Sequence, residues 1–412
     1  MAYIKRDFEQ VVSQLTAEYP VILITGPSQV GKNTMLQNLM QGSKRTYVSL
    51  EDYEARYLAK TDPELFLQIH KSPIFIDEVQ YAPELFTYIK MIVDKEHEPG
   101  AFWLTSSHIF EAIKGEIKSL AGRVAILSLS PLSQSEIYGV GGATAKEFSL
   151  EFSQLVERSE HRIPVDTLGI FERIFKGAMP AVNNGSYGDN QAFYSRYVSS
   201  IIDTKVRGLL GTFDELKFFK FLTIVATRTS QLISVNDIAK EAEIHHSHAK
   251  NWLSILETLG IIFYLQPYSN SSLKRAIKTP KLYFYDTGLV WYLTKWSSAK
   301  TLECGVFNGA ILENYVVSEI KKSFSNCAKT AYLYYYRDKD SKEIDLLIEH
   351  DGVINPIEIK KTSNPSSALT KVFSVLDKSS TPRATGAVIC MKPKLDAIDR
   401  QNYIIPIWCL WF

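Results

Sequence analysis

Two glycines and a lysine near the N-terminus have the spacing of a phosphate-binding loop. Gly26 and Gly31 enclose four residues, and Lys32 follows directly. Glycines at these places let backbone N–H groups curl around phosphate oxygens, and the lysine reaches the β- and γ-phosphates. An apolar run at residues 21–25 precedes the loop and a helical pattern follows it, so the positive end of the helix faces the same anion. The residues that we expect to bind nucleotide are Gly26, Pro27, Ser28, Gln29, Val30, Gly31, Lys32, Asn33 and Thr34.

One position departs from the usual form of this loop. A Ser or Thr hydroxyl normally binds Mg2+ after the lysine, and this chain has Asn33 there, with Thr34 one place later. An amide oxygen can also bind a hard cation, but its reach and geometry differ from those of a hydroxyl. The loop therefore predicts nucleotide binding more firmly than fast hydrolysis, and a glycine-rich turn without a ligand is the alternative.

An acidic pair at the end of a later apolar run supports the nucleotide hypothesis. Asp77 and Glu78 follow residues 73–76, and one whole apolar run lies between them and the loop. An aspartate at this place holds Mg2+ directly or through water, and a neighbouring glutamate can activate the attacking water. We expect Asp77 to bind the metal and Glu78 to act as the base, whereas a solvated strand end is the alternative.

Two further polar side chains are candidates for the same reaction. Ser107 follows the next apolar run, where it would sense the γ-phosphate or orient water, unless it only caps a turn. Arg123 lies just before the fifth run. A guanidinium supplied at the right moment, often by a neighbouring subunit, strongly assists phosphoryl transfer. Arg123 is therefore a candidate arginine finger, and a surface arginine without a partner is the alternative.

Five short apolar runs separated by helical patterns position these residues. They lie at residues 21–25, 46–50, 73–78, 101–105 and 124–129. This alternation is typical of an α/β fold in which helices cover both faces of a parallel sheet. Ligands of such sheets bind at the carboxyl ends of the strands. The first third of the chain therefore predicts a P-loop NTPase sheet with its ligand at that edge.

Composition bounds the rest of the molecule. The chain of 412 residues suggests about three domains, and its 45% of hydrophobic residues are enough for several cores. A formal net charge of +1 means that any nucleic-acid contact must come from a local patch. The four cysteines lie far apart, which favours reduced packing residues over a disulfide framework or a zinc site. The charged N-terminus and the lack of a long apolar run predict a cytoplasmic protein without membrane contact.

Five segments in the same order carry a resemblance to a known family. The loop Gly-Pro-Ser-Gln-Val-Gly-Lys is followed by Ile-Phe-Ile-Asp-Glu-Val-Gln, Phe-Trp-Leu-Thr-Ser-Ser, Leu-Ala-Gly-Arg and Leu-Ser-Pro-Leu-Ser-Gln-Ser-Glu-Ile. Together they resemble a large prokaryotic family of AAA-type ATPases whose members carry a C-terminal domain of unknown function. The resemblance extends along nearly the whole chain. Members usually have Thr or Ser at position 33 and Gly-Ser-Gln near 106–108, so Asn33 and Ser106-Ser-His here bear on turnover rather than on fold.

The middle of the chain has the element order of a winged helix-turn-helix. Three helical patterns between residues 218 and 259 precede two apolar runs, at 261–265 and 281–285, with a polar turn between them. The third helix begins His245-His-Ser-His-Ala-Lys250, and would contact phosphates and base edges of double-stranded DNA if it entered a major groove. A protein-docking module and a solvated basic face are the alternatives. The basic residues of the expected wing are Lys274, Arg275, Lys278 and Lys281.

Charged residues in the last third have the arrangement of PD-(D/E)xK nucleases. Asp345 is followed, with twelve residues between, by Glu358-x-Lys360 on the next strand of a predicted hairpin. The two carboxylates would hold a divalent metal at a scissile phosphate, and Lys360 would polarise water from the same side. Glu313 on the preceding helix matches the acidic residue that often completes such a site. A nuclease-like fold kept as a binding platform and ordinary strand charges are the alternatives.

The sequence thus predicts three domains. These are an AAA-type ATPase domain at residues 1–155, a helical linker plus winged helix-turn-helix at 156–295, and a restriction-endonuclease-like α/β domain at 296–412. The leading hypothesis is an ATPase that couples ATP binding and hydrolysis, with Mg2+, to DNA binding and to metal-dependent nuclease action. The alternative is a slow nucleotide-gated switch that docks protein partners. The expected partners are ATP or ADP, double-stranded DNA and further copies of the chain in a homo-oligomer.

Overall fold

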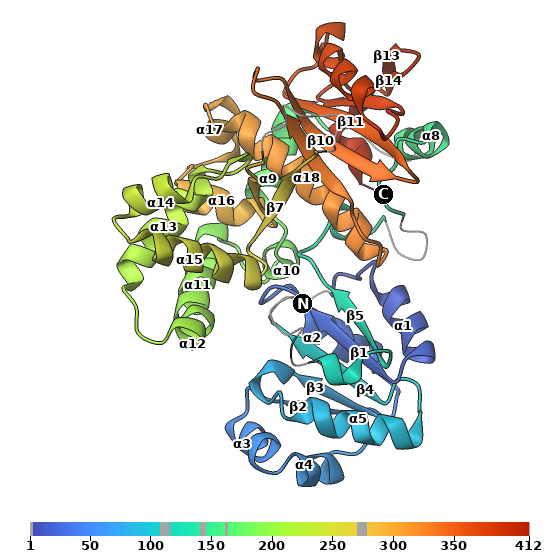
Figure 1. Cartoon of the computed structure of the whole chain (residues 1–412), viewed down its shortest axis with the longest axis vertical. Helices are drawn as coiled ribbons and strands as arrows, with labels where there is room; N and C mark the ends of the chain where they lie inside the picture. Colours follow the sequence, from blue (N-terminus) through green and yellow to red (C-terminus); the bar gives the residue numbers. More distant parts are fainter. Residues whose placement is uncertain are drawn as a thin grey trace.

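The computed structural model describes residues 3–107, 115, 117–140, 146–160, 164–269 and 278–411. Figure 1 shows the N-terminal α/β unit at one end of the molecule, with the middle and C-terminal parts of the chain side by side at the other. No helix within these residues is long and apolar enough to cross a membrane.

Five parallel strands form the N-terminal sheet in the order β2-β3-β4-β1-β5. They are β1 Val21–Thr25, β2 Thr46–Ser49, β3 Ile74–Asp77, β4 Phe102–Ser106 and β5 Val124–Ser128. Each begins and ends within one residue of the apolar run in the sequence, so the predicted α/β fold with a parallel sheet is confirmed. β1 lies between β4 and β5, and its last residue pairs with the last residue of each neighbour. The carboxyl ends of these strands therefore meet at one edge of the sheet.

Alternate residues of β1 pack on opposite faces of this sheet. Val21 and Leu23 belong to the core on one face, and Ile22 and Ile24 to the core on the other. Since successive side chains of a strand point to opposite sides, an all-apolar strand is the pattern of a sheet covered on both faces. The helices of this unit are α1 Glu9–Glu18, α2 Lys32–Leu39, α3 Tyr53–Thr61, α4 Pro63–Ile69 and α5 Leu85–Glu96.

A series of helices leads from the sheet to the middle of the chain. It comprises α7 Gln134–Ile137, α8 Phe152–Glu160, α9 Thr167–Lys176, α10 Pro180–Asn183, α11 Asn190–Ser200 and α12 Arg207–Leu210. The apolar residues within 193–210 have the spacing of one amphipathic helix. The structure instead joins α11 to α12 through a π-helical segment, Ile201–Val206. A π-helical turn takes up extra residues, so it changes which side chains of a helix face the core.

The next elements follow one another as helix, strand, helix, helix, strand and strand. They are α13 Glu215–Thr227, β6 Gln231–Leu232, α14 Val235–Ala242, α15 His246–Thr258, β7 Ile262–Pro267 and β8 Lys281–Phe284. Ser234 caps α14, because its hydroxyl accepts a hydrogen bond from the Asp237 N–H. Lys274 and Arg275 lie outside the described residues. Lys281 is buried and ion-paired, so its predicted place on an exposed basic wing is wrong.

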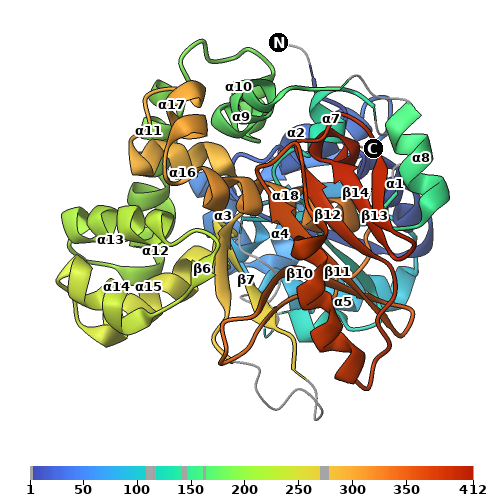
Figure 2. The same cartoon turned by 90° about the horizontal axis from the view of Figure 1, so that it is seen from above.

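The last third of the chain adds helices to a sheet of nine strands. Its elements are α16 Thr287–Thr294, α17 Ala299–Cys304, α18 Asn308–Asn326, β9 Leu333–Arg337, β10 Glu343–His350, β11 Val353–Lys360, β12 Gly386–Cys390, β13 Asp396–Asp399 and β14 Asn402–Pro406. The sheet has the order β13-β14-β12-β11-β10-β9-β7-β8-β6. β7 pairs in parallel with β9, so one sheet crosses the expected domain boundary at residue 295, and that boundary stays a prediction. Figure 2 shows the C-terminal strands over the N-terminal unit, with α13 to α15 projecting to one side.

Candidate nucleotide-binding site

The loop between β1 and α2 has the backbone of a tight anion-binding turn. Gly26 and Gly31 both have positive φ angles, +142° and +93°, in the region that favours glycine. A Cβ atom on Gly26 would lie 2.1 Å from the carbonyl oxygen of Leu129, which follows β5. Only glycine therefore lets the loop pass this close to the neighbouring chain, and α2 begins at Lys32 with its N-terminus at the loop.

Lys32 is folded into the loop that precedes it. Its Nζ atom donates hydrogen bonds to the carbonyl oxygens of Gly26 and Pro27, at 2.9 and 2.8 Å. Burial lowers the pKa of Lys32 to about 8, although the carboxylates of Glu78 and Asp77 act in the opposite direction. A phosphate oxygen would offer this ammonium a charged acceptor in place of neutral carbonyls. Lys32 therefore lies where a cation for the phosphates is expected.

Asn33 and Asp77 are brought together, as a shared metal would require. The Asn33 Nδ2 atom donates to Asp77 Oδ2 at 2.7 Å and to the Tyr47 hydroxyl at 2.8 Å. The Thr105 hydroxyl donates to the other Asp77 oxygen. The Asn33 Oδ1 atom is buried and has no hydrogen-bond partner within the described residues. An unpartnered amide oxygen beside a carboxylate is a set of hard oxygen donors, which fits Mg2+.

Glu78 is held by three donors at the end of β3. The Ser107 hydroxyl and the Gln80 side-chain amide both donate to its carboxylate. Lys205 Nζ lies 3.2 Å from Glu78 Oε2, in an ion pair whose two side chains are each only 9% exposed. Burial raises the pKa of Glu78, but the charges of Lys205 and Lys32 more than offset this and leave it below its usual value. The carboxylate is therefore charged and well ordered.

Lys205 is a residue of this site that the sequence did not reveal. It comes from the π-helical segment, far along the chain from the loop, and lines the same cavity as Lys32 and Glu78. Its signal was a basic residue in an apolar stripe, flanked by the buried Ile202 and Val206. A regular helix would place residues 201–206 differently. Helical periodicity therefore could not predict that the Lys205 side chain contacts Glu78.

A cavity of about 340 Å³ lies between the loop, the end of β3 and α10. It is lined by residues of both the sheet unit and the middle of the chain: Ser28, Gln29, Gly31, Lys32, Asn33, Thr34, Glu51, Asp77, Glu78, Ser107, Pro180, Ala181, Asn184 and Lys205. The structure thus gathers the predicted Gly31, Lys32, Asn33, Asp77 and Glu78 around one space. Three acidic side chains and two lysines give the walls a mixed charge.

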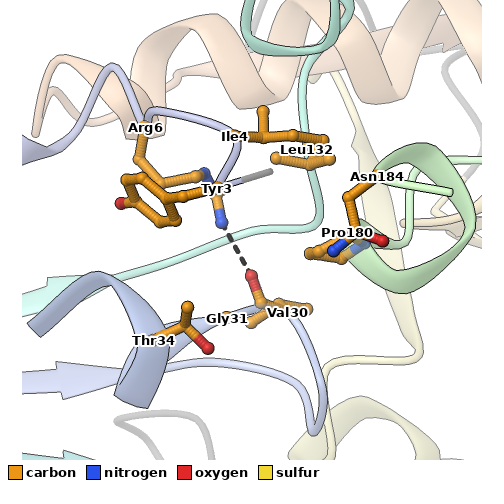
Figure 3. A pocket seen from close by; sticks show the side chains of 9 residues that line it. All are labelled: Tyr3, Ile4, Arg6, Val30, Gly31, Thr34, Leu132, Pro180 and Asn184. Carbon is orange, nitrogen blue, oxygen red and sulfur yellow. Dashed lines mark hydrogen bonds between the residues drawn. The ribbon is translucent and has the colours of Figure 1, made fainter. Parts of the chain in front are cut away.

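A second pocket of about 280 Å³ adjoins the loop and is shown in Figure 3. It shares Gly31, Thr34, Pro180 and Asn184 with the first cavity. The rest of its wall is largely apolar and comes from the N-terminal segment, the loop and the stretch after β5, namely Tyr3, Ile4, Arg6, Val30 and Leu132. Its wall is therefore more apolar than that of the first cavity.

Arg6 connects this pocket to the loop, a role that no pattern in the sequence indicated. It donates to the carbonyl of Val30 at 2.7 Å, as Figure 3 shows, and to the carbonyl of Ser130 at 2.7 Å. Its Nε atom also pairs with Glu136 at 2.8 Å, and both side chains are almost fully buried. A buried guanidinium with several well-placed acceptors fixes the backbone around it. The loop therefore depends on the N-terminal segment and on the stretch after β5.

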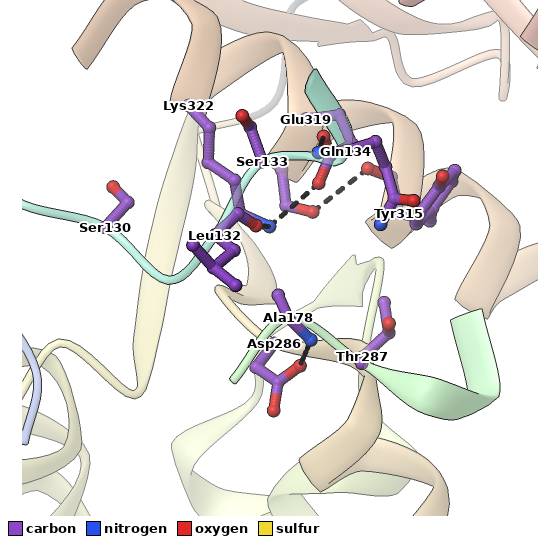
Figure 4. Close-up of polar contacts among 12 residues, drawn as sticks. Ser130, Leu132, Ser133, Gln134, Ala178, Asp286, Thr287, Tyr315, Glu319 and Lys322 are labelled. Carbon is purple, nitrogen blue, oxygen red and sulfur yellow. Dashed lines mark hydrogen bonds and ion pairs between the residues drawn. The ribbon is translucent and has the colours of Figure 1, made fainter. Parts of the chain in front are cut away.

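The stretch after β5 is also attached to the C-terminal part of the chain. The Gln134 N–H donates to Glu319 at 2.9 Å, and Lys322 donates to the carbonyl of Leu132 at 3.1 Å. Figure 4 shows Glu319 and Lys322, both on α18, turned toward this backbone. Glu319 and Lys322 pair with each other at 2.8 Å and are buried. The same stretch thus touches the nucleotide loop on one side and α18 on the other.

Arg123 lies away from the cavity of its own chain. It directly precedes β5, at the opposite edge of the sheet from the loop, and pairs with Asp94 of α5. Both side chains of this pair are more than one-third exposed. Arg123 therefore cannot reach a nucleotide held by its own loop, and its role as an arginine finger stays a prediction for an assembly of chains.

The predicted nuclease residues meet, but lysines lie among them. Asp345 on β10 and Glu358 on β11 stand opposite each other, and Lys360 Nζ contacts them at 2.8 and 2.9 Å. Burial and the Asp345 charge raise the pKa of Glu358 to about 8. Glu313 instead accepts hydrogen bonds from Lys281 at 2.9 Å and from the Tyr283 hydroxyl at 2.6 Å.

A metal site made of Glu313, Asp345 and Glu358 therefore stays a prediction. Among the residues that the structure describes, no three His, Cys, Asp or Glu side chains are grouped so as to hold a metal ion. Lys281 also pairs with Glu343, so its ammonium is shared between two carboxylates. Each acid of this cluster thus already has a buried or half-buried ammonium as its counter-charge.

Three family models match the chain in order. They are an AAA domain over residues 18–138, a domain of unknown function (DUF8612) over 168–300, and a domain of unknown function (DUF4143) over 308–410. Together with the parallel sheet and the loop geometry, the first match supports a P-loop domain similar to those of AAA-type ATPases in the N-terminal third. The C-terminal match bears out a domain of unknown function and does not identify it as a nuclease.

The chain is also similar in sequence to curated relatives and in structure to solved proteins. The uncharacterized proteins Mb2031c of Mycobacterium bovis and Rv2008c of Mycobacterium tuberculosis are each 26% identical over 374 residues, which is 90% of this chain and 77% of theirs. The Walker-type ATPase paby2304 of Pyrococcus abyssi is 12% identical, with a TM-score of 0.44 over 71% of this chain and 96% of that one. The RuvB Holliday junction branch migration motor of Thermotoga maritima is 15% identical, with a TM-score of 0.31 over 63% and 89%.

Proposed function

We propose that this protein binds ATP with Mg2+ in the cavity beside Lys32, hydrolyses it slowly, and uses the nucleotide state to control the middle and C-terminal parts of the chain. The observation that carries the proposal is the composition of the cavity wall. Lys32, Asn33, Asp77 and Glu78 come from the sheet unit, whereas Lys205 comes from the middle of the chain. A nucleotide bound there touches both parts, so its loss changes the contacts between them.

Each part of the nucleotide has a complementary group. The phosphates fit the loop N–H groups and Lys32, and the apolar pocket of Ile4, Val30 and Leu132 suits the base. Asn33 Oδ1 and Asp77 would hold Mg2+, which neutralises charge on the phosphates when bound. Because Gly26 and Gly31 have no Cβ atom, the backbone of the loop can come close to the phosphate oxygens.

Glu78 is the base in this proposal. Water attacks the γ-phosphorus, and Glu78 takes the proton that the water loses. The bond from the γ-phosphorus to the bridging oxygen breaks, and its electron pair leaves on ADP. Two features slow the reaction: Asn33 supplies no hydroxyl to the metal, and Glu78 already accepts from Ser107, Gln80 and Lys205. Slow turnover is the property of a switch.

Binding and product release test this proposal on the full-length chain. Isothermal titration with MgATP and MgADP should detect binding of both, and phosphate release should be slow. Glu78→Gln should keep ATP binding and lose phosphate release, because it removes the base but leaves the phosphate loop intact. Absence of binding for both nucleotides would overturn the proposal, and so would a Glu78→Gln variant that hydrolyses ATP at the parental rate.

A second function is supported by the exposed face of α15. The solvent-facing side chains at its N-terminal end are polar or basic: His246, Ser247, His248, Lys250 and Asn251. We propose that this face contacts double-stranded DNA, with α15 in the major groove. Anisotropy of a labelled duplex should show binding that weakens with salt, and Lys250→Ala should lower the salt slope by about one. Binding of a protein partner with no affinity for DNA would select the docking alternative instead.

The acidic cluster of the C-terminal part fits a binding platform better than a nuclease. Lys360 bridges Asp345 and Glu358, and Lys281 bridges Glu313 and Glu343. Lys360 contacts one oxygen of each acid, Asp345 Oδ2 and Glu358 Oε2, so a metal would share these carboxylates with an ammonium. We therefore expect no Mg2+-dependent nicking of supercoiled plasmid by the parent chain. Nicking that Asp345→Asn abolishes would restore the nuclease hypothesis.

A further inference from the structure

We propose that Lys205 is the group that distinguishes ATP from ADP in this site, by moving from Glu78 to the γ-phosphate when ATP binds. The inference rests on the proposed nucleotide site and adds a γ-phosphate sensor and a lock on the base. Three observations support it: Lys205 lines the cavity, it pairs with Glu78, and it lies on a π-helical segment.

The position of Lys205 suits the γ-phosphate rather than the other phosphates. Glu78 has to lie one water molecule away from the γ-phosphorus in order to take a proton from the attacking water. Lys205 Nζ lies 3.2 Å from Glu78 Oε2. A cation next to the base is therefore next to the γ-phosphate oxygens, whereas Lys32 is held by the carbonyl oxygens of Gly26 and Pro27 within the loop itself.

The charges of the cavity favour this exchange. Of the lining residues that the structure describes, Lys32 and Lys205 are the cations, facing the carboxylates of Glu51, Asp77 and Glu78. A triphosphate brings more negative charge than one bound Mg2+ neutralises, so a second ammonium near its terminal phosphate is stabilising. ADP brings no terminal phosphate to this point. It leaves Lys205 with Glu78, where the pair satisfies two buried charges.

Moving Lys205 also frees the base. In the present arrangement burial lowers the pKa of Lys205, the Glu78 charge more than offsets this, and the ammonium stays charged beside the carboxylate. A carboxylate paired with an ammonium is a weaker base toward water. Once Lys205 contacts the γ-phosphate, Glu78 keeps Ser107 and Gln80 as orienting donors and can accept the proton. The same lysine thereby couples recognition of ATP to activation of the base.

The backbone that bears Lys205 suits a moving contact. The π-helical segment Ile201–Val206 joins α11 to α12, and π-helical turns occur frequently at functional sites. Lys205 also lies 3.4 Å from the Tyr81 hydroxyl, on the turn that follows Glu78. Arg207, two residues on, is exposed and pairs with Asp203 and Glu215 outside the cavity. A shift of Lys205 therefore reaches α11 and α12 without disturbing the loop.

The test is the ratio of ATP to ADP affinity, measured by isothermal titration with Mg2+ on the full-length chain. Lys205→Met should weaken ATP binding roughly tenfold to a hundredfold, as expected for one lost charge-assisted contact, and change ADP binding less than about threefold. Lys205→Arg should keep most of the preference for ATP. Arg207→Met is the matched control, an exposed cation two residues further on at the start of α12, and should leave the ratio unchanged.

A double variant separates sensing from simple loss of the ion pair. Lys205→Met leaves Glu78 buried without its cation, so Lys205→Met/Glu78→Gln removes both charges. It should lose the preference for ATP as fully as Lys205→Met, whereas Glu78→Gln alone should keep it. A parental ratio in Lys205→Met or in the double variant overturns the assignment to Lys205 alone. Parent chain that binds neither nucleotide overturns both this inference and the proposed function.

Discussion

Two parts of the molecule place a pair of carboxylates beside lysines, and they differ in what neutralises the acids. In the N-terminal unit Asp77 contacts the amide of Asn33, and Glu78 pairs with Lys205 in the wall of a cavity. In the C-terminal sheet Lys360 contacts both Asp345 and Glu358 directly. Among the described residues each arrangement has one buried oxygen without a partner, Asn33 Oδ1 in the first and Glu358 Oε1 in the second. The first adjoins a cavity lined by both of its acids, whereas in the second a single ammonium bridges the two carboxylates.

The pKa values express the same difference. Glu78 has a pKa below its usual value, because the lysine charges outweigh burial. Glu358 has a pKa raised to about 8, because burial and Asp345 outweigh Lys360, and burial raises the pKa of Glu313 to about 7. The two acidic clusters look equally catalytic in the sequence. Burial and charge nevertheless favour a charged carboxylate at Glu78, which attracts cations, and protonated carboxyl groups at Glu358 and Glu313.

Replacing a lysine of each cluster by alanine should give the largest difference in ATP affinity. Lys32→Ala should weaken ATP binding by about a hundredfold or more, since its ammonium is the cation of the phosphate loop. Lys360→Ala, the matched change in the other cluster, should leave ATP affinity within about twofold of the parent. Titration calorimetry with MgATP measures both. An equal loss in the two variants would mean that the clusters act as one site.

Restoring a hydroxyl after Lys32 should raise turnover. Asn33→Thr places a hydroxyl where such loops normally bind Mg2+, and it also frees Asp77 Oδ2 from the Asn33 amide. We expect phosphate release to rise by about tenfold while ATP affinity changes little. Asn33→Ala is the control, because it frees Asp77 without adding a ligand. A rise of the same size in Asn33→Ala would assign the slow turnover to the Asn33–Asp77 contact instead.

The sheet and the loop could be predicted because their signals are local. The run at residues 21–25 is apolar throughout, as a strand buried on both faces must be, and two glycines fix the turn after it. Ser234 likewise marks the start of α14 by its capping chemistry. These features depend on neighbours within one strand or one turn, so one sequence contains all the information.

Contacts between distant segments could not be predicted in the same way. Lys205 reaches Glu78 only because a π-helical segment lies between α11 and α12, and helical periodicity does not reveal such a turn. Arg6 joins Val30, Ser130 and Glu136, which are far apart in the chain. Lys281 looked like a wing residue by type, and its burial against Glu313 depends on the packing of α18.

The two clusters should respond to pH in opposite directions. Glu358 has a folded-state pKa raised above its unfolded value, so its contribution to the free energy of unfolding is complete below about pH 4.5 and is lost as pH rises toward about 8. Glu358→Gln mimics the protonated acid, so from pH 5 to 8 it should lose less stability than the parent, by on the order of 1 kcal/mol.

Glu78 has a lowered pKa, so its contribution to the free energy of unfolding is lost as pH falls below the usual range of a glutamate. Urea unfolding across pH 4 to 9 compares the two variants, and parallel profiles for Glu358→Gln and Glu78→Gln would remove the distinction between the clusters.

The smallest effect is expected at Arg123, which belongs to neither cluster. Its pair with Asp94 is solvent-exposed, so Arg123→Ala should change the free energy of unfolding by less than about 1 kcal/mol. Within one chain Arg123 is at the far edge of the sheet, so ATP affinity of dilute protein should also stay at the parental value. If chains assemble with Arg123 of one copy at the cavity of the next, turnover per chain will rise with protein concentration in the parent and not in Arg123→Ala. Mass photometry with ATP, beside phosphate release over the same concentrations, measures this. Turnover that rises equally in both proteins would leave assembly intact as an idea and exclude Arg123 as the residue that it brings to the site.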